Sequence, residues 1–318
     1  MPFGQIVVGP PGSGKSTYCS GAHQFLGAIG RKVSIVNLDP ANESYTYPCA
    51  LDVMDLIKLE DIMEADGLGP NGGIIHALEA LEENFDWLEH GLSHLKDDYV
   101  IFDCPGQVEL FTHHDSLRNI ITKLEKLGYR LVVLHLVDAH YCSDPAKYIS
   151  VLMLALRSML QLDLPHINVL SKIDLLNNYS GMDFNLDYYT EVQDLSYLLP
   201  RLEADSRLAK YAKLNAAICE MVEDFSLVQF ETLCVEDKRS MARLLQQVDR
   251  AGGYAFGSSE ISADTVWADA VRGGWLNTGN QALDDQERWI TQRDVYERAE
   301  RDNWEQEGKQ AQGQTPDV

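Results

Sequence analysis

The stretch GPPGSGKST, residues 9–17, decides the fold of this 318-residue chain. It follows the apolar run QIVVG, precedes a segment with helical periodicity, and contains the pattern Gly-x-x-x-x-Gly-Lys-Ser. Its glycines let backbone N–H groups turn inward around a phosphate, and the helix N-terminus adds positive potential. The lysine reaches the outer phosphate oxygens and the serine hydroxyl ligates Mg²⁺. The candidate phosphate-binding residues are therefore Gly12, Ser13, Gly14, Lys15, Ser16 and Thr17.

Short apolar runs recur outward from this loop, and helical periodicity separates them. The runs cover residues 5–9, 33–38, 99–103, 131–138, 166–171 and 226–230. Most are apolar throughout rather than alternating, which is typical of strands covered by helices on both faces. This pattern predicts an α/β fold, a doubly wound, mostly parallel sheet of the P-loop NTPase type with helical insertions. Ligands bind such sheets at the carboxyl ends of the strands.

Two regions are longer than a connection between neighbouring strands requires. We predict one nucleotide-binding domain over residues 1–256, with insertions at about 50–98 and about 177–224. Residues 257–318 are polar, acidic and poor in aliphatic clusters. Such a composition buries little apolar surface, so we expect a mobile or weakly helical C-terminal tail.

Charge and cysteine usage narrow the partners and the compartment. The formal net charge of −23 leaves no basic excess to displace counterions from nucleic-acid phosphates, so we expect no direct nucleic-acid binding. No apolar run reaches the roughly 18 residues that a membrane helix needs, so we expect no membrane partner. Six cysteines are spaced singly along the chain. That spacing favours reduced thiols in a cytosolic or nuclear protein.

A carboxylate for Mg²⁺ is expected at the end of a second strand, and YVIFDCPGQVEL supplies Asp103 there. Gly106 lets a backbone N–H approach a γ-phosphate, and Gln107 stands where a side chain could orient an attacking water. Neutral amides are weak bases, so the role of Gln107 would be positional. The alternatives are that Asp103 caps a helix and that Gln107 is an ordinary surface residue.

The stretch HINVLSKIDLL places Ser171, Lys172 and Asp174 after another apolar strand. A carboxylate there accepts the N1–H and the N2–H of guanine, whereas adenine leaves it unpaired. That mismatch is worth roughly 10⁴-fold in selectivity, so we predict GTP rather than ATP. The usual guanine signature has Asn or Thr where this chain has Ser171. A backbone N–H near Leu233 or Cys234 is the candidate donor to the guanine O6.

The stretch GLGPNGG, residues 67–73, holds more glycine than a connection between two helices requires. A plain surface turn is one explanation. The physical alternative is a recognition loop: glycine permits close backbone approach, Pro70 fixes a dihedral angle, and the Asn71 amide can donate to a phosphate oxygen without adding charge.

Together these motifs resemble the GPN-loop GTPases, a family of dimeric P-loop proteins. The matching stretches are GPPGSGKST, NLDPAN at 37–42, GPNGG at 69–73, DCPGQVE at 103–109 and SKID at 171–174. The resemblance covers residues 3–256 and is strongest to one eukaryotic branch of the family. It implies that Gly69, Pro70 and Asn71 reach into the nucleotide site of the other subunit. It also implies that Asp39 contacts the waters of Mg²⁺ or the attacking water, with Glu109 as a helper.

The resemblance further implies a Mg²⁺-dependent dimeric switch that binds GTP and GDP and hydrolyses GTP. Its expected partners are a second copy or a paralogous GPN-loop GTPase, together with RNA polymerase II subunits or assembly factors. Its expected location is the cytoplasm, with shuttling to the nucleus. The catalytic residues would be Asp39, Asn71, Asp103, Gln107 and Glu109, and the metal ligands Ser16, Asp39 and Asp103. The alternative function is a nucleotide-gated scaffold with negligible turnover.

Overall fold

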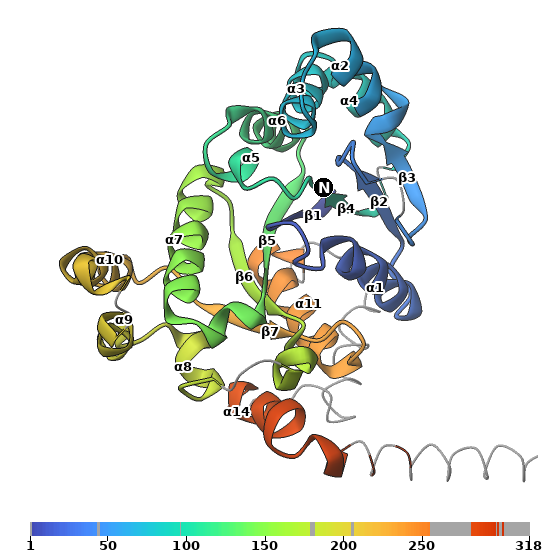
Figure 1. Ribbon diagram of the computed structural model, residues 1–318. Helices are drawn as coiled ribbons and strands as arrows, with labels where there is room; N and C mark the ends of the chain where they lie inside the picture. The colour runs from blue at the N-terminus through green and yellow to red at the C-terminus, as the bar shows by residue number, and fades with distance from the viewer. Residues whose placement is uncertain are drawn as a thin grey trace, which may run out of the picture.

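One parallel sheet organises the chain (Figure 1). The computed structural model describes residues 2–42, 45–95, 97–178, 182–204, 207–254, 281–296, 298 and 301. Seven strands lie in the order β3-β2-β4-β1-β5-β6-β7, and every neighbouring pair is parallel. The strands are β1 Phe3–Val8, β2 Val33–Asn37, β3 Cys49–Asp52, β4 Tyr99–Asp103, β5 Arg130–Asp138, β6 His166–Ser171 and β7 Phe230–Leu233. The prediction of a doubly wound sheet is confirmed.

Two strands differ from the sequence-based expectation. Strand β3 was not predicted, because its four residues CALD form a half-exposed edge strand without an apolar run. Strand β7 begins at Phe230, where the predicted run ends. The reason is local: helix α10 continues to Phe225, and Ser226 caps it in the left-handed region with φ of 48°.

Helices cover both faces of the sheet, as three clusters of buried apolar side chains show. Helices α1 and α11 cover one face; α3 to α6 cover the other beside β1, β2 and β4, and α7 to α10 cover it beside β5 to β7. The α-helices are α1 Lys15–Ala28, α2 Leu59–Asp66, α3 Pro70–Glu83, α4 Phe85–Ser93, α5 Val108–Thr112, α6 Asp115–Lys126, α7 Pro145–Leu162, α8 Leu186–Glu191, α9 Leu199–Ala204, α10 Ala212–Phe225, α11 Lys238–Gly252 and α14 Gln281–Gln286. Shorter turns are η1 Val53–Asp55, η2 Ala139–Ser143, η3 Ile173–Asn178, η4 Leu195–Leu198, η5 Ala209–Tyr211 and η6 Glu287–Thr291.

The glycine-rich stretch is largely the start of a helix rather than a free loop. Helix α2 ends at Asp66, and Gly67 caps it in the left-handed region with φ of 63°. Helix α3 begins at Pro70, a favoured first position because proline has no N–H to leave unsatisfied. A Cβ atom on Gly73 would lie 2.6 Å from Leu59 Cδ1. Glycine at this position therefore lets α2 pack closely on α3 and present Asn71 on its first turn.

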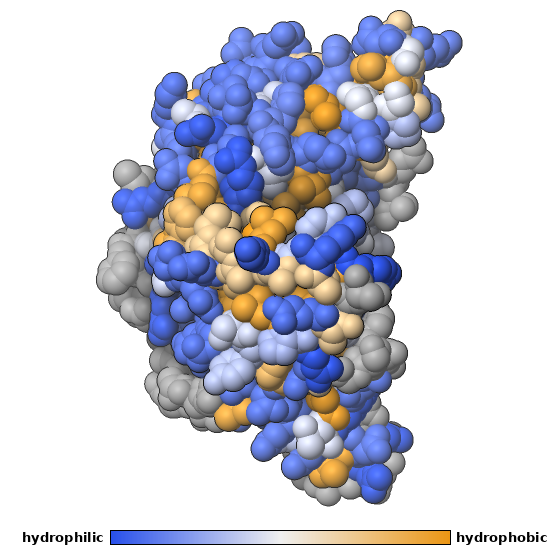
Figure 2. Space-filling model, turned by 60° about the vertical axis from the view of Figure 1, so that its left-hand side comes forward, coloured by the Kyte–Doolittle hydropathy of each residue, from blue (hydrophilic) through white to orange (hydrophobic). Residues whose placement is uncertain are grey.

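The second insertion contains α8, η4, α9, η5 and α10, as expected for residues 177–224. Figure 2 shows apolar side chains gathered near the middle of one face of the molecule. The exposed large apolar residues include Met153 and Leu160 of α7, and Leu214, Met221 and Phe225 of α10. None of the helices in the described ranges is long and apolar enough to cross a membrane.

Part of the predicted mobile tail is folded against the domain. Helix α14 and turn η6 form one segment, which we call the C-terminal segment, residues 281–296. Ala282 and Asp285 are buried, and Trp289 and Ile290 pack against the cluster under α7 to α10. Of the two alternatives for the tail, this segment matches the helical one, and its packing on the domain was not predicted. Most other residues of the expected tail lie outside the described ranges.

Candidate nucleotide site

The phosphate-binding loop joins β1 to α1 through three glycines in conformations that disfavour other residues. Gly9, Gly12 and Gly14 have φ angles of 149°, 77° and 93°. A Cβ atom on Gly9 would lie 2.2 Å from the Leu136 carbonyl oxygen, so only glycine fits between β1 and β5. Lys15 Nζ donates to the Gly9 carbonyl at 3.1 Å. Burial lowers the pKa of Lys15, although the carboxylates of Asp103 and Asp39 act in the opposite direction.

Asp103 is the centre of the predicted metal end of the site. Its Oδ2 accepts from Ser16 Oγ and from the Tyr47 hydroxyl, both at 2.8 Å. Asn42 Nδ2 donates to Ser16 Oγ at 3.2 Å. Asp103 Oδ1 is buried and has no hydrogen-bond partner. Burial raises the pKa of Asp103. An ionised carboxylate that is buried needs a partner for each oxygen, and Asp103 Oδ1 has none.

These groups fit a bound Mg²⁺. The cation takes oxygen ligands, and it usually binds to one or two carboxylates together with substrate phosphates and water. Ser16 and the unpartnered Asp103 Oδ1 supply such oxygens beside the phosphate-binding loop. Within the described residues, no group of three or more His, Cys, Asp or Glu side chains could hold a metal by itself. The fit is therefore to a cation that the nucleotide helps to bind.

Asp39 lies near this centre but makes a local turn. Its Oδ1 accepts from the Ala41 backbone N–H at 3.0 Å, and its own N–H donates to Asn37 Oδ1 at 3.1 Å. Burial raises the pKa of Asp39, and Lys15 opposes that shift. Among the three predicted metal residues, Ser16 and Asp103 are hydrogen-bonded to each other, and the Asp39 carboxylate contributes to the raised pKa of Asp103.

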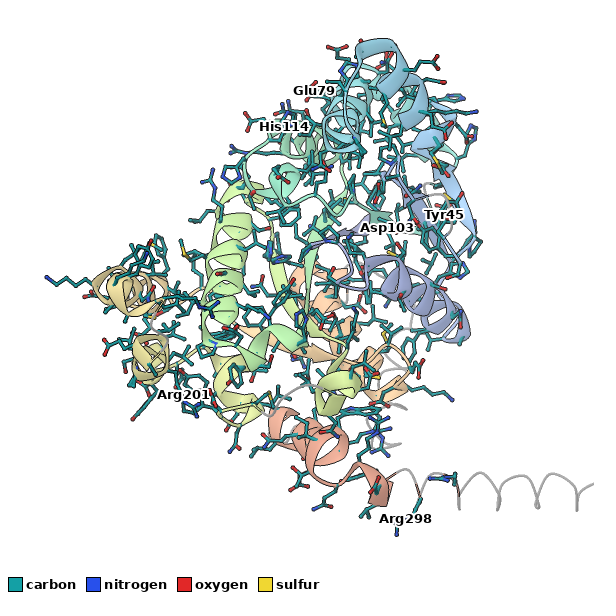
Figure 3. The ribbon with its side chains drawn as sticks, in the orientation of Figure 1. Tyr45, Glu79, Asp103, His114, Arg201 and Arg298 are labelled. Carbon is teal, nitrogen blue, oxygen red and sulfur yellow. The ribbon has the colours of Figure 1, made fainter. Side chains whose placement is uncertain are left out.

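Aromatic residues beside Asp103 were not predicted from the sequence. Tyr47 stacks on Tyr45 with ring centroids 4.8 Å apart, and Tyr45 donates to Asp52 Oδ2 at 2.7 Å (Figure 3). Tyr47 donates to Asp103, as described above. Neither tyrosine belongs to a motif, since both come from the connection between β2 and β3. Asn42 is different, because it ends the stretch NLDPAN that the sequence singled out.

The glycine-rich helix start contacts the segment that follows Asp103. Gln107 Nε2 donates to Asn71 Oδ1 of the same chain at 3.1 Å, while Gln107 Oε1 is buried without a partner. A Cβ atom on Gly106 would lie 2.9 Å from Lys15 Nζ, so the Asn71–Gln107 pair lies beside the phosphate-binding loop. This contact within one chain was not predicted. Glu109 is exposed on the first turn of α5.

Polar contacts also connect α3 to α6, the second helix after Gln107. His114 Nε2 lies 3.1 Å from Glu79 Oε1 (Figure 3). Asn119 Nδ2 donates to Glu82 Oε1 at 2.8 Å, and Lys123 Nζ donates to the Glu82 carbonyl at 2.6 Å. A movement of Gln107 and the helices after it would therefore also move α3, which carries Asn71.

The predicted base-recognition strand is bonded directly to the phosphate-binding loop. Ser171 Oγ donates to the Ser13 carbonyl at 2.7 Å and lies 3.0 Å from the Val137 carbonyl. Lys172 has a left-handed backbone with φ of 59°, and its Nζ donates to the Gly12 carbonyl and, at 2.8 Å, to Asp138 Oδ2. The short Ser171 side chain thus supports the loop where the usual signature has Asn or Thr.

Asp174 lies half-buried in η3, near Cys234. Burial raises the pKa of the Cys234 thiol to about 12, and the Asp174 carboxylate acts in the same direction. The Cys234 backbone N–H donates to Ser240 Oγ at 3.0 Å, and Leu233 is fully buried in β7 opposite Ser171. Ser240 thus already engages the Cys234 N–H, one of the two candidate donors to the guanine O6, whereas a donor near Leu233 stays a prediction.

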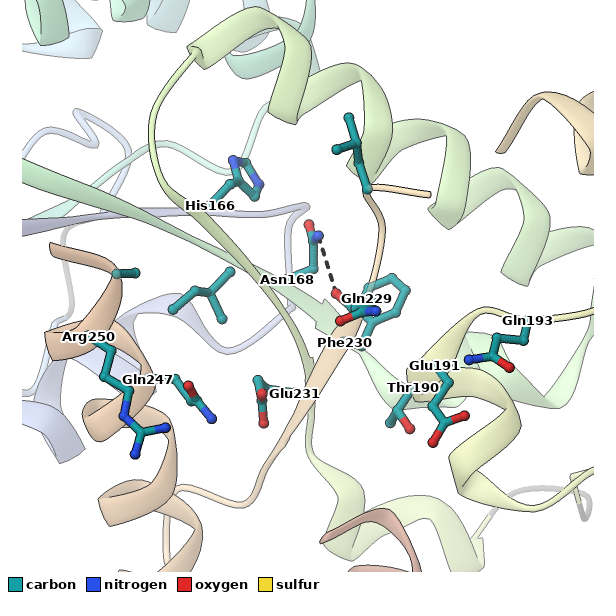
Figure 4. A pocket seen from close by; sticks show the side chains of 13 residues that line it. His166, Asn168, Thr190, Glu191, Gln193, Gln229, Phe230, Glu231, Gln247 and Arg250 are labelled. Carbon is teal, nitrogen blue, oxygen red and sulfur yellow. Dashed lines mark hydrogen bonds between the residues drawn. The ribbon is translucent and has the colours of Figure 1, made fainter. Parts of the chain in front are cut away.

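Two cavities border this part of the sheet. One of about 620 Å³ runs beside the predicted Thr17, between α1 and the connection that follows β7. Another of about 790 Å³ lies at the amino ends of β6 and β7, where Asn168 donates to the Gln229 carbonyl at 3.4 Å (Figure 4). Nucleotides bind at the carboxyl ends of such strands, so only the first cavity adjoins the candidate site.

Comparisons with known proteins agree with this geometry. A family model described as a conserved hypothetical ATP binding protein matches residues 7–254. A solved structure of a GTPase from Pyrococcus abyssi in its apo form superposes with a TM-score of 0.64 at 26% identity, covering 78% of this chain and 97% of that one. The family description names ATP, whereas the structural relative is named a GTPase.

Curated relatives are similar over most of the chain. The GPN-loop GTPase 2 of Schizosaccharomyces pombe is 55% identical over 97% of both chains. The GPN-loop GTPase 2 of Saccharomyces cerevisiae is 53% identical over 94% of this chain and 88% of that protein. The GPN-loop GTPase QQT1 of Arabidopsis thaliana is 54% identical over 82% and 89%, respectively.

Proposed function

Because this chain belongs to the GPN-loop GTPases and is itself a GTPase of the P-loop type, we propose that it works as a Mg²⁺-dependent dimeric switch. Its hydrolysis of GTP would serve the assembly and nuclear import of RNA polymerase II. The observation that carries the metal dependence is Asp103, whose buried Oδ1 has no partner although Ser16 is bonded to its other oxygen. A cation beside the phosphates would satisfy that atom.

The proposed mechanism assigns one task to each group around the γ-phosphate. Lys15 binds the outer phosphate oxygens, where its charge stabilises the transferring group. Ser16 and Asp103 would hold Mg²⁺, which would supply positive charge beside the phosphates. Gln107 orients the attacking water through its unpartnered Oε1. Asp39 faces the same region and helps to position that water.

Base choice is assigned to the segment after β6. Asp174 accepts the two guanine N–H groups, and Lys172 holds its own segment against the phosphate-binding loop through Gly12. The aliphatic stem of Lys172 would line the base pocket, as lysine stems often cover apolar surfaces. We assign no donor to the guanine O6, because Ser240 Oγ already accepts from the Cys234 N–H.

We place the catalytic help of Asn71 in a dimer. Within one chain Asn71 is exposed and accepts from Gln107. In the proposed dimer, formed with a second copy or a paralogous GPN-loop GTPase, Asn71 Nδ2 donates to a phosphate oxygen of the nucleotide bound by the partner. Gly69 and Pro70 present Asn71 there, and Glu109, exposed on the first turn of α5, is the proposed helper near the attacking water. The family resemblance supports this arrangement.

A complementation experiment tests the dimeric mechanism. Asn71→Ala keeps the phosphate-binding loop and lacks the amide, whereas Lys15→Ala keeps the amide and lacks the phosphate-binding charge. We expect each variant alone to hydrolyse GTP at least about tenfold more slowly in single turnover, since a transition-state donor is typically worth more than that. Mixing the two should restore turnover in the sites that pair an intact Lys15 with an intact Asn71 from the partner.

The mixed sample also gives the contradicting result. No gain over the sum of the two variants, with mixed dimers shown by co-purification of two different affinity tags, would mean that Asn71 acts only within its own chain. Gln107→Ala provides the companion measurement, because it removes both the water contact and the resting partner of Asn71. Unchanged single-turnover rates for both Asn71→Ala and Gln107→Ala would instead favour a nucleotide-gated scaffold.

The cellular part of the proposal comes from the family resemblance alone. We propose that the protein acts in the cytoplasm, passes into the nucleus, and contacts RNA polymerase II subunits or assembly factors. Replacing the gene product by Lys15→Ala should leave RNA polymerase II subunits in the cytoplasm, which imaging of a tagged subunit would detect. Normal nuclear levels of the tagged subunit would count against this role.

A further inference from the structure

The C-terminal segment, residues 281–296, is anchored beside the edge of the sheet that holds the base-recognition residues (Figure 1). Asp285 is 3% exposed, accepts from Arg243 Nη2 of α11 at 2.6 Å, and also accepts from the Thr232 hydroxyl of β7. Burial raises the pKa of this carboxyl, while Arg243 counteracts the shift. A buried carboxylate with two such partners fixes the segment on the domain.

From this anchor the segment reaches the loop that carries Asp174. Arg293 Nη1 donates to the Asp174 carbonyl at 3.0 Å. Asn177 Nδ2, three residues further along the same loop, donates to the Trp289 carbonyl at 2.6 Å. The loop η3 and the turn η6 pack against each other along this contact. The backbone on which the Asp174 carboxylate is mounted is thus held from the C-terminal side.

The same segment reaches the second loop near the base. Arg288 Nη2 lies 3.5 Å from Asp237 Oδ1, with both side chains largely buried. Asp237 caps α11 by accepting from the N–H groups of Arg239 and Ser240, and its own N–H donates to the Cys234 carbonyl at 3.1 Å. Residues 234–237 therefore form a compact turn that Arg288 ties to the C-terminal segment.

We propose that Arg288 and Arg293 are positioning residues of the guanine site, which they serve by bridging its two loops. Those loops lie about sixty residues apart in sequence, and the pairing of β6 with β7 ends at Ser171 and Leu233, so the residues beyond that pair need another restraint. Asp174 can pair with two guanine N–H groups at once only if its position is held to within roughly 0.5 Å. The bridge supplies that restraint, so the C-terminal segment sets guanine affinity and selectivity without touching the reacting phosphate.

This inference rests on the proposed role of Asp174, and its test separates the two. The variant is Arg293→Ala, with Arg293→Lys as the conservative change. Arg298→Ala is the matched control, because Arg298 is exposed two residues beyond the end of the C-terminal segment (Figure 3). The readouts are the dissociation rate of a fluorescent GDP analogue and the affinity ratio between GTP and ITP. ITP lacks the exocyclic amine that Asp174 would bind.

We expect Arg293→Ala to speed GDP release and to reduce the preference for GTP over ITP, each by about tenfold, the value of one lost hydrogen bond. Arg293→Lys should recover part of both. The single-turnover rate at saturating GTP should stay within about twofold of the unmodified protein, since the phosphate end is untouched. A purely structural role would lower affinity for GTP and ITP equally and leave the ratio unchanged.

Two outcomes would overturn the proposal. One is an Arg293→Ala protein that matches Arg298→Ala in release rate and selectivity. The other is an equal loss of GTP and ITP binding. If Arg293→Ala does not fold, Arg288→Ala and Asn177→Ala weaken the bridge at its other contacts and answer the same question. If Asp174→Asn leaves base choice unchanged, the assignment of Asp174 fails instead.

Discussion

Asp174 is the single carboxylate to which we assign base choice, and Arg293 donates to its backbone carbonyl from the C-terminal segment. Replacing it by Asn exchanges two acceptors for one acceptor and one donor. The amide can donate to the carbonyl that xanthine carries at C2. We therefore expect Asp174→Asn to prefer xanthosine over guanosine nucleotides by at least about tenfold, measured by competition binding.

The control for this substitution is Asp163→Asn. Asp163 is exposed between α7 and β6, and its backbone φ of 52° suits asparagine. It should bind GTP as the unmodified protein does. Unchanged guanine selectivity in Asp174→Asn would show that another group reads the base.

At the scale of single residues, the sequence predicted those candidate site residues that belong to a short motif or end a strand. Lys15 and Ser16 follow from the spacing of the glycines, and Asp103 follows from the end of its strand. Tyr47 could not be predicted, because it meets Asp103 only once the connection between β2 and β3 has folded back. The predicted Cys234 donor failed because a backbone N–H was assumed to be free, whereas the hydroxyl of Ser240, six residues later, accepts from it.

Among the elements, helix α3 both packs closely against α2 and presents Asn71 on its first turn. Gly72 and Gly73 are adjacent in its first turns but face different surroundings. A Cβ atom on Gly72 would meet Leu68 at 3.5 Å, an ordinary contact, whereas one on Gly73 would lie 2.6 Å from Leu59 and 3.3 Å from Met63. Alanine is favoured over glycine in a helix by about 1 kcal/mol. The two positions should therefore respond differently to the same substitution.

We expect Gly72→Ala to raise the free energy of unfolding by up to about 1 kcal/mol. Gly73→Ala should be less stable than Gly72→Ala by about 1 kcal/mol or more, because Leu59 and Met63 must move. Urea unfolding of both variants measures the difference, and each serves as the control for the other. Equal stabilities would show that α2 is not held closely against α3 at Gly73.

Element types were predicted better than element boundaries. The apolar runs gave five strands nearly in place, since burial on both faces leaves a continuous signal. Edge strand β3 left no such signal, and β7 starts late because α10 extends to Phe225. A helix was expected after the glycine-rich stretch, but its first turn from Pro70 was predicted as a loop, because three glycines near its start mask the helical pattern.

For the molecule as a whole, buried histidines should make stability depend on pH. Burial lowers the pKa of His135 to about 4, although Asn168 hydrogen-bonds it, and nearby Lys15 acts with the burial. The ring also lies against Phe111 of α5 and His166 of β6. Between about pH 6.5 and pH 4 the unfolded chain binds a proton that the folded protein does not, so stability is lost as the pH falls through this window.

We expect the free energy of unfolding to fall between about pH 7.5 and about pH 5 by roughly 2 kcal/mol more in the unmodified protein than in His135→Gln. Denaturant unfolding at both pH values gives this difference. The raised pKa values of Asp39, Asp103 and Asp285 act with the opposite sign, but they are common to both proteins and cancel. His90→Gln, at an exposed position on α4, should behave like the unmodified protein. An identical fall in His135→Gln would rule this histidine out.

The topology was the most predictable property of the whole molecule, because a phosphate-binding loop after the first strand and continuous apolar runs leave few arrangements of a parallel sheet. The packed C-terminal segment was not predictable from composition. Its polar sequence suggested a mobile tail, yet a few specific side chains, Asp285 and Trp289 among them, dock it on the domain.

The bonds from Ser171 to Ser13 and from Lys172 to Gly12 have a consequence for inhibitor discovery. Because these bonds connect the base-recognition segment to the phosphate-binding loop, we expect phosphate binding to change the surface that a base-sized fragment contacts. Screening the empty protein and screening it with pyrophosphate present would then give different hit sets, and compounds selected in only one screen would distinguish the two conditions.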